Sequence, residues 1–255
     1  MATTVDVEEL EAKVRVMYQH VAEEPAGKYH FELGRPLAER LGYPMDVIDE
    51  VPAGATESFA GVGYFFDLAD LGVDESVLDL GSGSGMDAFF AAHRVGAGGR
   101  VLGIDFTPEQ LSKARSLAAG AGIQQVEFRE GRIDSLPVED ASVDCVISNG
   151  VINLAPEKDR VFAEAARVLR PGGRLAIADI VSEQHLKQSI VCDADLWASC
   201  IGGAAQQDAY REAIEAAGLR IETIRKNPYE FISEQARDAS AKYGVKSVSL
   251  LATKA

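Results

Sequence analysis

Two kinds of apolar spacing divide the chain. Within residues 5–21, apolar side chains recur mostly every three or four positions, which predicts an amphipathic helix. Residues 22–63 contain proline at positions 25, 36, 44 and 52 among scattered glycines and aromatics, which predicts short helices and turns rather than a sheet. We therefore expect residues 1–70 to form an N-terminal helical lid, which would also serve as a platform for a second substrate.

From residue 76 onward, short apolar runs alternate with segments of helical spacing. Strands are predicted at residues 77–80, 100–104, 126–129, 143–148 and 174–179, and helices at 87–95, 108–121 and 160–169. This alternation predicts a parallel sheet with right-handed crossovers and helices on both faces. Residues 219–225 and 246–253 alternate like strands and are expected to close the sheet as an antiparallel edge pair.

The expected fold class is therefore α/β. We predict a Rossmann-like, doubly wound, mostly parallel seven-stranded sheet over residues 71–255, with residues 183–218 as a helical cap inserted after the fifth strand. Thr107 and Gln110 have the spacing of a capping box for one of the helices. The sequence Pro171-Gly172-Gly173 is expected to break the chain before the fifth strand.

Composition narrows the range of partners. Lys plus Arg number 25 against 40 for Asp plus Glu, a formal net charge of -15 that should repel nucleic acid and anionic lipid. The three cysteines show no CxxC spacing, which fits a reducing compartment. There is no signal-like start and no apolar run of about 18 residues. We expect a soluble cytoplasmic protein, a monomer or homodimer, that acts on a small molecule and holds no metal.

A glycine cluster follows the first predicted strand, in the sequence Gly81-Ser82-Gly83-Ser84-Gly85. In open parallel sheets ligands bind at this edge, where glycines permit a tight turn and the next helix directs N–H groups toward the ligand. A dinucleotide fingerprint has glycine where this chain has Met86, and an apolar residue where it has Asp79. The pattern disfavours a pyrophosphate ligand, although a nucleotide-dependent oxidoreductase stays open as an alternative.

Two acids flank the glycine cluster. Asp105 ends the second predicted strand and is placed to accept hydrogen bonds from both hydroxyls of a ribose. Asp79 lies close enough to the turn to hold the ammonium of an amino-acid moiety. The pair together fits a ligand with a nucleoside at one end and an amino acid at the other.

The pattern acid-x-Gly-x-Gly-x-Gly at residues 79–85, followed by Asp105, resembles the class I S-adenosylmethionine-dependent methyltransferases. The resemblance continues through residues 131–134, which look like the adenine-edge loop, through Ser148-Asn149, and through the turn at 169–173. It implies S-adenosyl-L-methionine as cofactor. The cofactor-binding residues that it implies are Asp79, Gly81, Ser82, Gly83, Gly85, Asp105, Phe106, Arg132, Ile133 and Asn149.

Residues 103–107, 147–158 and 200–204 are similar to arsenite methyltransferases in particular. In that family cysteine thiolates bind trivalent arsenic, and of the corresponding positions only Cys200 is still cysteine, whereas Gly150 and Val62 occupy two others. Because arsenic needs two or three thiolates, we expect a thiol or sulfide acceptor instead. Arsenite remains an alternative, as does C- or O-methylation of a small apolar metabolite. Val62, Gly150, Trp197 and Cys200 are the expected acceptor-pocket residues.

Methyl transfer from a sulfonium requires positioning and exclusion of water more than it requires catalytic groups. A thiol or hydroxyl acceptor must still lose a proton, and the expected lid supplies side chains that could take it. The candidates for the catalytic base are Tyr18, His20, Tyr29 and His30. A protein that binds S-adenosylmethionine without catalysis is a further alternative, which an acceptor cavity filled by bulky side chains would favour.

Overall fold

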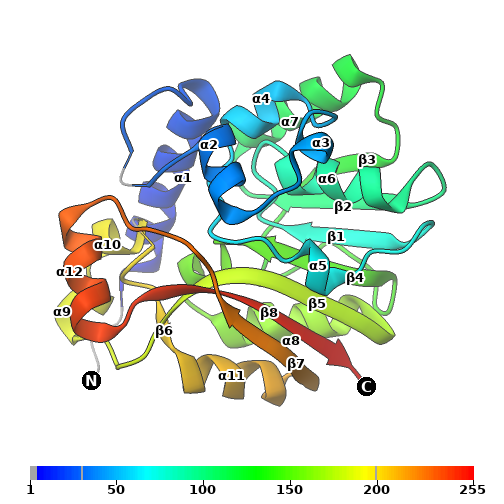
Figure 1. The fold of residues 1–255 in the computed structure, drawn as a ribbon. Helices are drawn as coiled ribbons and strands as arrows, with labels where there is room; N and C mark the ends of the chain where they lie inside the picture. The colour runs from blue at the N-terminus through cyan, green and yellow to red at the C-terminus, as the bar shows by residue number, and fades with distance from the viewer. Residues whose placement is uncertain (1–4, 30, 199) are drawn as a thin grey trace.

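Parallel strands form the centre of the sheet, as the alternation of strand and helix predicts (Figure 1). The computed structural model describes residues 5–29, 31–198 and 200–255. Their sheet has the strand order β3-β2-β1-β4-β5-β8-β7, and β6 pairs with β5. The strands are β1 Ser76–Leu80, β2 Arg100–Asp105, β3 Val126–Glu130, β4 Val143–Asn149, β5 Leu169–Ser182, β6 Ala205–Gln206, β7 Leu219–Lys226 and β8 Lys246–Lys254.

The strand order reverses next to β1, which pairs in parallel with β2 on one side and with β4 on the other. At the carboxyl end of this trio, Leu80 lies between Ile104 and Ser148. The chain therefore leaves β1 at the switch point where doubly wound sheets bind ligands. The strand β8 runs antiparallel to both β5 and β7, which confirms the predicted edge pair. The two-residue β6 makes eight strands in the described sheet rather than seven.

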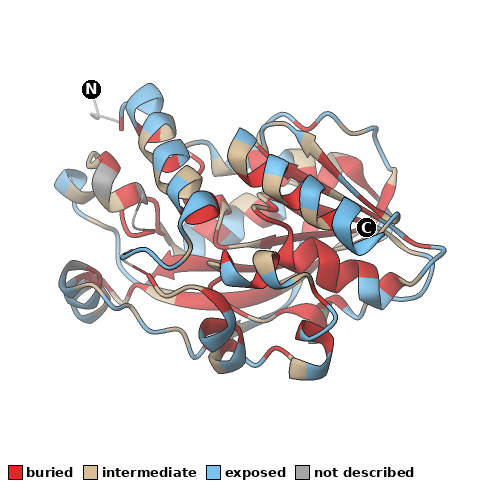
Figure 2. Cartoon of the chain, turned by 90° about the horizontal axis from the view of Figure 1, so that it is seen from above, coloured by how far each residue is buried: buried red, intermediate tan, exposed pale blue. Residues whose placement is uncertain are grey.

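Helices cover both faces of the sheet (Figure 1). The sheet-covering helices are α5 Phe66–Ala69, α6 Met86–Val95, α7 Pro108–Ala121, α8 Lys158–Val168 and α11 Gln207–Ala216. Each turns an apolar stripe inward, and Phe90 of α6 and Phe162 of α8 are fully buried on opposite faces. Figure 2 shows the result: the central strands are largely buried, while the outer helix surfaces are exposed.

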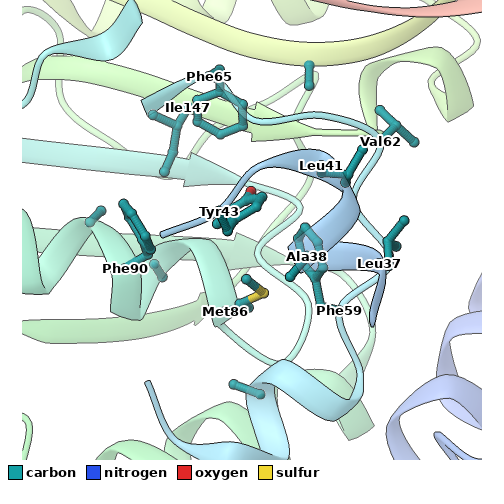
Figure 3. Close-up of a cluster of buried hydrophobic side chains, with 14 of the residues drawn as sticks. Leu37, Ala38, Leu41, Tyr43, Phe59, Val62, Phe65, Met86, Phe90 and Ile147 are labelled. Carbon is teal, nitrogen blue, oxygen red and sulfur yellow. The ribbon is translucent and has the colours of Figure 1, made fainter. Parts of the chain in front are cut away.

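The N-terminal part begins with the predicted amphipathic helix, α1 Val7–Glu23. The proline-containing segment after it forms short helices, as predicted: α2 Gly34–Leu41, α3 Met45–Ile48 and α4 Ala53–Glu57. They pack above the carboxyl edge of the sheet, with α1 against α7 and the later helix α10 (Ala194–Ala198). Tyr43 anchors this layer, since its ring lies 5.2 Å from Phe59 and 5.6 Å from Phe90 (Figure 3). Aromatic contacts of this kind add to the stability that burial provides.

The segment after β5, which the sequence predicts to be a helical cap, is only partly helical. It contains α9 (Gln188–Val191) and α10, and then the chain returns to the sheet through β6 and α11. A late helix, α12 (Glu234–Tyr243), lies beside them (Figure 1). No helix in the described ranges is long and apolar enough to cross a membrane.

Two local predictions are wrong. Thr107 makes no side-chain capping bond, and the Gln110 side chain does not complete the box: its Nε2 donates to the Tyr18 carbonyl oxygen (2.7 Å), and its Oε1 accepts from Ser84 Oγ (2.5 Å). The Pro171-Gly172-Gly173 sequence does not interrupt the sheet, because β5 runs from Leu169 to Ser182. Its irregularity appears instead as a register shift between β4 and β5 near Val143.

Candidate active site

A cleft opens at the carboxyl ends of β1, β2 and β4, beneath α1. It encloses about 1160 Å³, including the open space at its mouth. Residues from α1, the glycine turn, the end of β2 and the loops after β3 and β4 form its wall. Of the residues predicted to bind cofactor, those that line it are Asp79, Gly81, Ser82, Gly83, Asp105, Phe106, Arg132, Ile133 and Asn149. The topology thus gathers almost the whole predicted set into one cavity.

The glycine turn needs its glycines for two different reasons. Gly81, Gly83 and Gly85 all have positive φ, at 70°, 52° and 94°, which other residues adopt only with strain. A Cβ on Gly81 would also lie 2.5 Å from Val151. Gly85 does not line the cleft, and a Cβ there would lie 2.6 Å from the Phe128 ring. Conformation and packing therefore explain glycine at position 85.

Asp105 holds the turn against the end of β2. Its Oδ2 accepts from the Gly83 amide (2.9 Å) and its Oδ1 from the Thr107 amide (2.8 Å). Burial raises the pKa of this carboxyl, and the backbone N–H donors oppose that rise. Each carboxylate oxygen has a further lone pair, so the side chain can accept hydrogen bonds from a ligand while it keeps the turn in place.

Two buried polar atoms in the cleft wall have no hydrogen-bond partner, Asp79 Oδ2 and Ser82 Oγ. Such atoms cost about 1–3 kcal/mol each when they stay unsatisfied. The pKa of Asp79 is raised well above its usual value by burial, with further contributions from the charges of Asp87 and Asp105. A ligand that brings an ammonium and a hydroxyl group would satisfy both atoms, so the donor and acceptor set fits S-adenosylmethionine.

The helix α1 closes the cleft from above. The Glu11 carboxylate pairs with Arg132 across the opening (2.8 Å), and Arg132 also pairs with Asp134 (3.0 Å). The guanidinium of Arg15 lies 5.5 Å from the centre of the Phe106 ring, which itself lines the cleft. An ion pair to Arg132 and a cation–π contact to Phe106 thus hold α1 over this side of the cleft.

The predicted base candidates that the structure describes do not come together. Among these three, only Tyr18 lines the cleft, and burial beside Cys200 and Tyr229 raises its pKa well above the usual value, so its hydroxyl stays protonated. The His20 side chain is exposed, and Tyr29 donates its hydroxyl proton to the Glu24 carbonyl oxygen (2.7 Å). His30 lies outside the described residues.

The four predicted acceptor residues do not line this cleft. Val62 and Gly150 lie against each other, since a Cβ on Gly150 would lie 3.1 Å from Val62 Cγ1. Cys200 is buried, and burial together with the charge of Asp179 raises the pKa of its thiol to about 12. Trp197 is buried too, with the Lys158 ammonium 4.8 Å from its ring centre. Their assignment to an acceptor pocket stays a prediction.

The carboxylate of Asp87 also lines the wall, and the sequence analysis did not assign it to the site. It is buried at the start of α6, where it accepts from Tyr43 Oη (2.6 Å) and from Asn149 Nδ2 (2.9 Å). Burial raises its pKa to about 6. Asn149 Oδ1 in turn accepts from the Val62 amide (2.7 Å). The sequence signal for Asp87 is an acid in the first helical turn after the glycine cluster. Acids are also common there because they stabilise the start of a helix, so the position alone does not indicate a site residue.

Comparison with known proteins agrees with this geometry. Residues 71–218 match the family model described as a methyltransferase domain. The arsenite methyltransferase of Halobacterium salinarum is 45% identical over 199 residues, which are 77% of this chain and 51% of that protein. The arsenite methyltransferase of Aquipseudomonas alcaligenes is 46% identical over 135 residues, 50% of this chain and 39% of that one. The chain thus spans about half, or less, of the curated relatives it matches.

Solved structures give the same result. An arsenic(III) S-adenosylmethionine methyltransferase from Chlamydomonas reinhardtii superposes with a TM-score of 0.64 at 30% identity, covering 87% of this chain and 74% of that one. A putative sarcosine dimethylglycine methyltransferase from Galdieria sulphuraria reaches a TM-score of 0.67 at 19% identity, covering 95% and 98%, which shows the shared fold. From its sheet, its glycine turn and these matches, the chain belongs to the S-adenosylmethionine-dependent methyltransferase domain family and is similar to arsenite methyltransferases.

Proposed function

We propose that this chain transfers a methyl group from S-adenosylmethionine to a small, soft nucleophile, a thiol or a sulfide. The observation that carries this choice of acceptor is the contact between Val62 and Gly150. The sequence resemblance assigns arsenic-binding cysteines to both positions, and here an apolar side chain packs against a glycine. We propose that the pocket still suits a polarisable nucleophile such as sulfur, but that it lacks the thiolates that arsenic needs.

The cleft residues divide the binding of the cofactor among them. Asp79 and Ser82 supply the unsatisfied acceptor and hydroxyl for the amino-acid end, and Asp105 accepts from the ribose. Phe106 and Ile133 line the side where adenine would lie. When bound, the cofactor supplies an electrophilic methyl group on a sulfonium. The lid helix α1 excludes water and holds the acceptor near attack distance.

The acceptor must arrive as an anion or lose a proton in the cleft. A thiol has an unperturbed pKa of about 8.5 and ionises far more easily than an alcohol. Tyr18, which stays protonated, serves here as a hydrogen-bond donor that orients the acceptor rather than as a base. Because Tyr18 does not act as a base in this proposal, the acceptor that is favoured is a soft nucleophile that ionises without one.

Arsenite is the second candidate acceptor, supported by the similarity to arsenite methyltransferases and by Cys200. Against it, burial raises the pKa of the thiols of Cys145 and Cys200 to about 12, which disfavours the thiolates that arsenic binds. Methylation of carbon or oxygen in a small apolar metabolite is the third, because the cleft wall beside Asn149 includes the apolar residues Phe59, Val151 and Leu154. In each case we place the lid in residues 1–70 and the cap in residues 183–218.

The test supplies methanethiol, sulfide, a phenol and arsenite in parallel and measures release of S-adenosylhomocysteine. We expect turnover of the thiol or sulfide, unchanged by Cys200→Ser. Preferred turnover of arsenite that Cys200→Ser abolishes would support the second candidate. Preferred turnover of the phenol would support the third.

A further inference from the structure

The carboxylate of Asp87 has only neutral partners. Tyr43 donates to one oxygen and Asn149 to the other, at 2.6 and 2.9 Å. In the described part of the chain, no Lys, Arg or His side chain pairs with Asp87, nor with its neighbours Asp79 and Asp105. A buried carboxylate without a cation is costly, and hydrogen bonds from neutral groups offset only part of that cost.

The whole cleft is short of positive charge. Arg132 is the basic residue among the described side chains that line it, and Glu11 and Asp134 already pair with that guanidinium. Asp79, Asp87 and Asp105 stay uncompensated, and the charges of Asp87 and Asp105 both act on Asp79. The cavity therefore has an excess of acidic groups, and all three acids attract a ligand that carries positive charge.

The acids at positions 79 and 105 have a polar group of the cofactor to bind, but Asp87 has no such assignment. A neutral asparagine at position 87 could take part in the same hydrogen bonds with Tyr43 and Asn149, because the tyrosine hydroxyl both donates and accepts. The local packing therefore explains a polar side chain here and leaves the negative charge unexplained. Asp87 lies in the same wall as Asn149. The Asn149 side chain donates to Asp87 and accepts from the Val62 amide, so it links the start of α6 to the segment that contains Val62.

We propose that Asp87 recognises the positive charge that distinguishes S-adenosylmethionine from S-adenosylhomocysteine, and so shifts the binding preference of the cleft toward the substrate form of the cofactor. This inference rests on the proposed function, because it concerns the same cleft. The methyl sulfonium carries a formal charge of +1, and the thioether left after transfer carries none. Asp87 thus attracts the ligand before the reaction more than after it, which favours exchange of product for fresh cofactor.

The test compares Kd values for S-adenosylmethionine, S-adenosylhomocysteine and sinefungin, which carries an amine in place of the sulfonium. Calorimetry on wild type, Asp87→Asn and Tyr43→Phe gives the ratio between the cationic and neutral ligands. We expect Asp87→Asn to reduce the preference for both cations by about tenfold, equivalent to about 1.4 kcal/mol. Tyr43→Phe keeps the charge, so its ratio should stay within about twofold of wild type. Asp46→Asn, which removes an exposed acid near Tyr43, is the matched control for net charge.

Equal loss of all three ligands in Asp87→Asn would overturn the inference and leave the cofactor assignment intact. Wild-type protein that binds none of the ligands would overturn both. Should the variant fail to fold, wild type alone gives the answer across pH. The titratable groups facing Asp87 are Tyr43 and Asp79, with Asp105 beyond Asp79. The relative preference for S-adenosylmethionine should fall as the pH drops from 8 to 5, and a constant ratio would refute the role of Asp87.

Discussion

Gly150 and Val62 are contact neighbours, although 88 positions separate them in the chain. A Cβ built on Gly150 would lie 3.1 Å from Cγ1 of Val62. Gly150 follows β4, and Val62 lies in the segment that leads to α5, where its amide is fixed by Asn149 Oδ1 at 2.7 Å. Two cysteine sulfurs at these positions could reach a common centre, and the residues present here, valine and glycine, supply no ligand for a soft ion.

The first prediction concerns Asp105, whose carboxylate lies at the end of β2. Asp105→Ala removes the acceptor for the ribose and the brace of the Gly83 amide, so cofactor affinity should fall by about 1–3 kcal/mol. Calorimetry with S-adenosylmethionine measures the loss. Glu130→Gln removes an exposed acid from the end of the neighbouring strand β3 and should leave affinity unchanged. Equal affinities for the two variants would contradict the assignment.

The sheet and the cofactor cleft could be predicted from sequence because their signals are local. Apolar runs mark the strands, and the glycine turn needs backbone conformations that glycine provides. Asp79 and Asp105 follow directly, since residues at the ends of adjacent parallel strands meet at one edge of the sheet. None of these inferences requires knowledge of how distant segments pack.

The acceptor side depends on such packing, and there the sequence says less. Gln110 has capping-box spacing, but a partner far away in the chain, the Tyr18 carbonyl group, competes for its side chain. The role of Asp87 depends on Tyr43, which an aromatic cluster brings to the start of α6. His20 and Tyr18 lie on the same helix, and only the rotation of α1 against α7 and α10 decides that Tyr18 faces the cleft.

The second prediction is a pH dependence of stability in the protein without ligand. Burial raises the pKa of Asp87 to about 6 from its ordinary value of 3.8. Folding therefore favours the protonated acid, and the resulting stability is present below pH about 4 and lost as the pH rises through about 6. Asp87→Asn is neutral at every pH, so relative to wild type it should gain about 2–3 kcal/mol between pH 4 and pH 7.5. Urea unfolding at both pH values measures this gain, and a constant difference would refute the raised pKa.

The third prediction concerns α1, the proposed lid helix. The Glu11–Arg132 pair joins α1 to the loop after β3 at 2.8 Å, and both side chains are partly exposed. Its contribution to global stability should be below about 1 kcal/mol, but its loss should open the lid more often. In Glu11→Gln we expect faster amide exchange in α1 and faster dissociation of the cofactor. Glu9→Gln, which breaks the Glu9–Lys13 pair on the same helix, is the control. Equal exchange rates in the two variants would show that the Glu11–Arg132 pair does not hold α1 in place.

The last prediction places cysteines at the two positions that the family resemblance assigns to arsenic binding. In Val62→Cys/Gly150→Cys, two thiols should lie close enough to bind arsenite together, with Cys200 as a third ligand, because Asn153 hydrogen-bonds both the Gly150 carbonyl group and the Cys200 thiol. We expect binding at least about tenfold tighter than in either single variant. The backbone φ of 73° at Gly150 is unfavourable for cysteine and should cost about 1–2 kcal/mol of stability.

Fluorescence reports the binding directly, since Trp197 is the single tryptophan and its carbonyl group accepts a hydrogen bond from the Cys200 amide at 2.8 Å. Gly150→Ala reproduces the backbone strain without a thiol, and Cys200→Ser added to the double variant removes the third ligand. If the double variant binds arsenite no better than Val62→Cys alone, positions 62 and 150 do not form a common site. The absence of cysteine at positions 62 and 150 would then no longer count against arsenite as the acceptor.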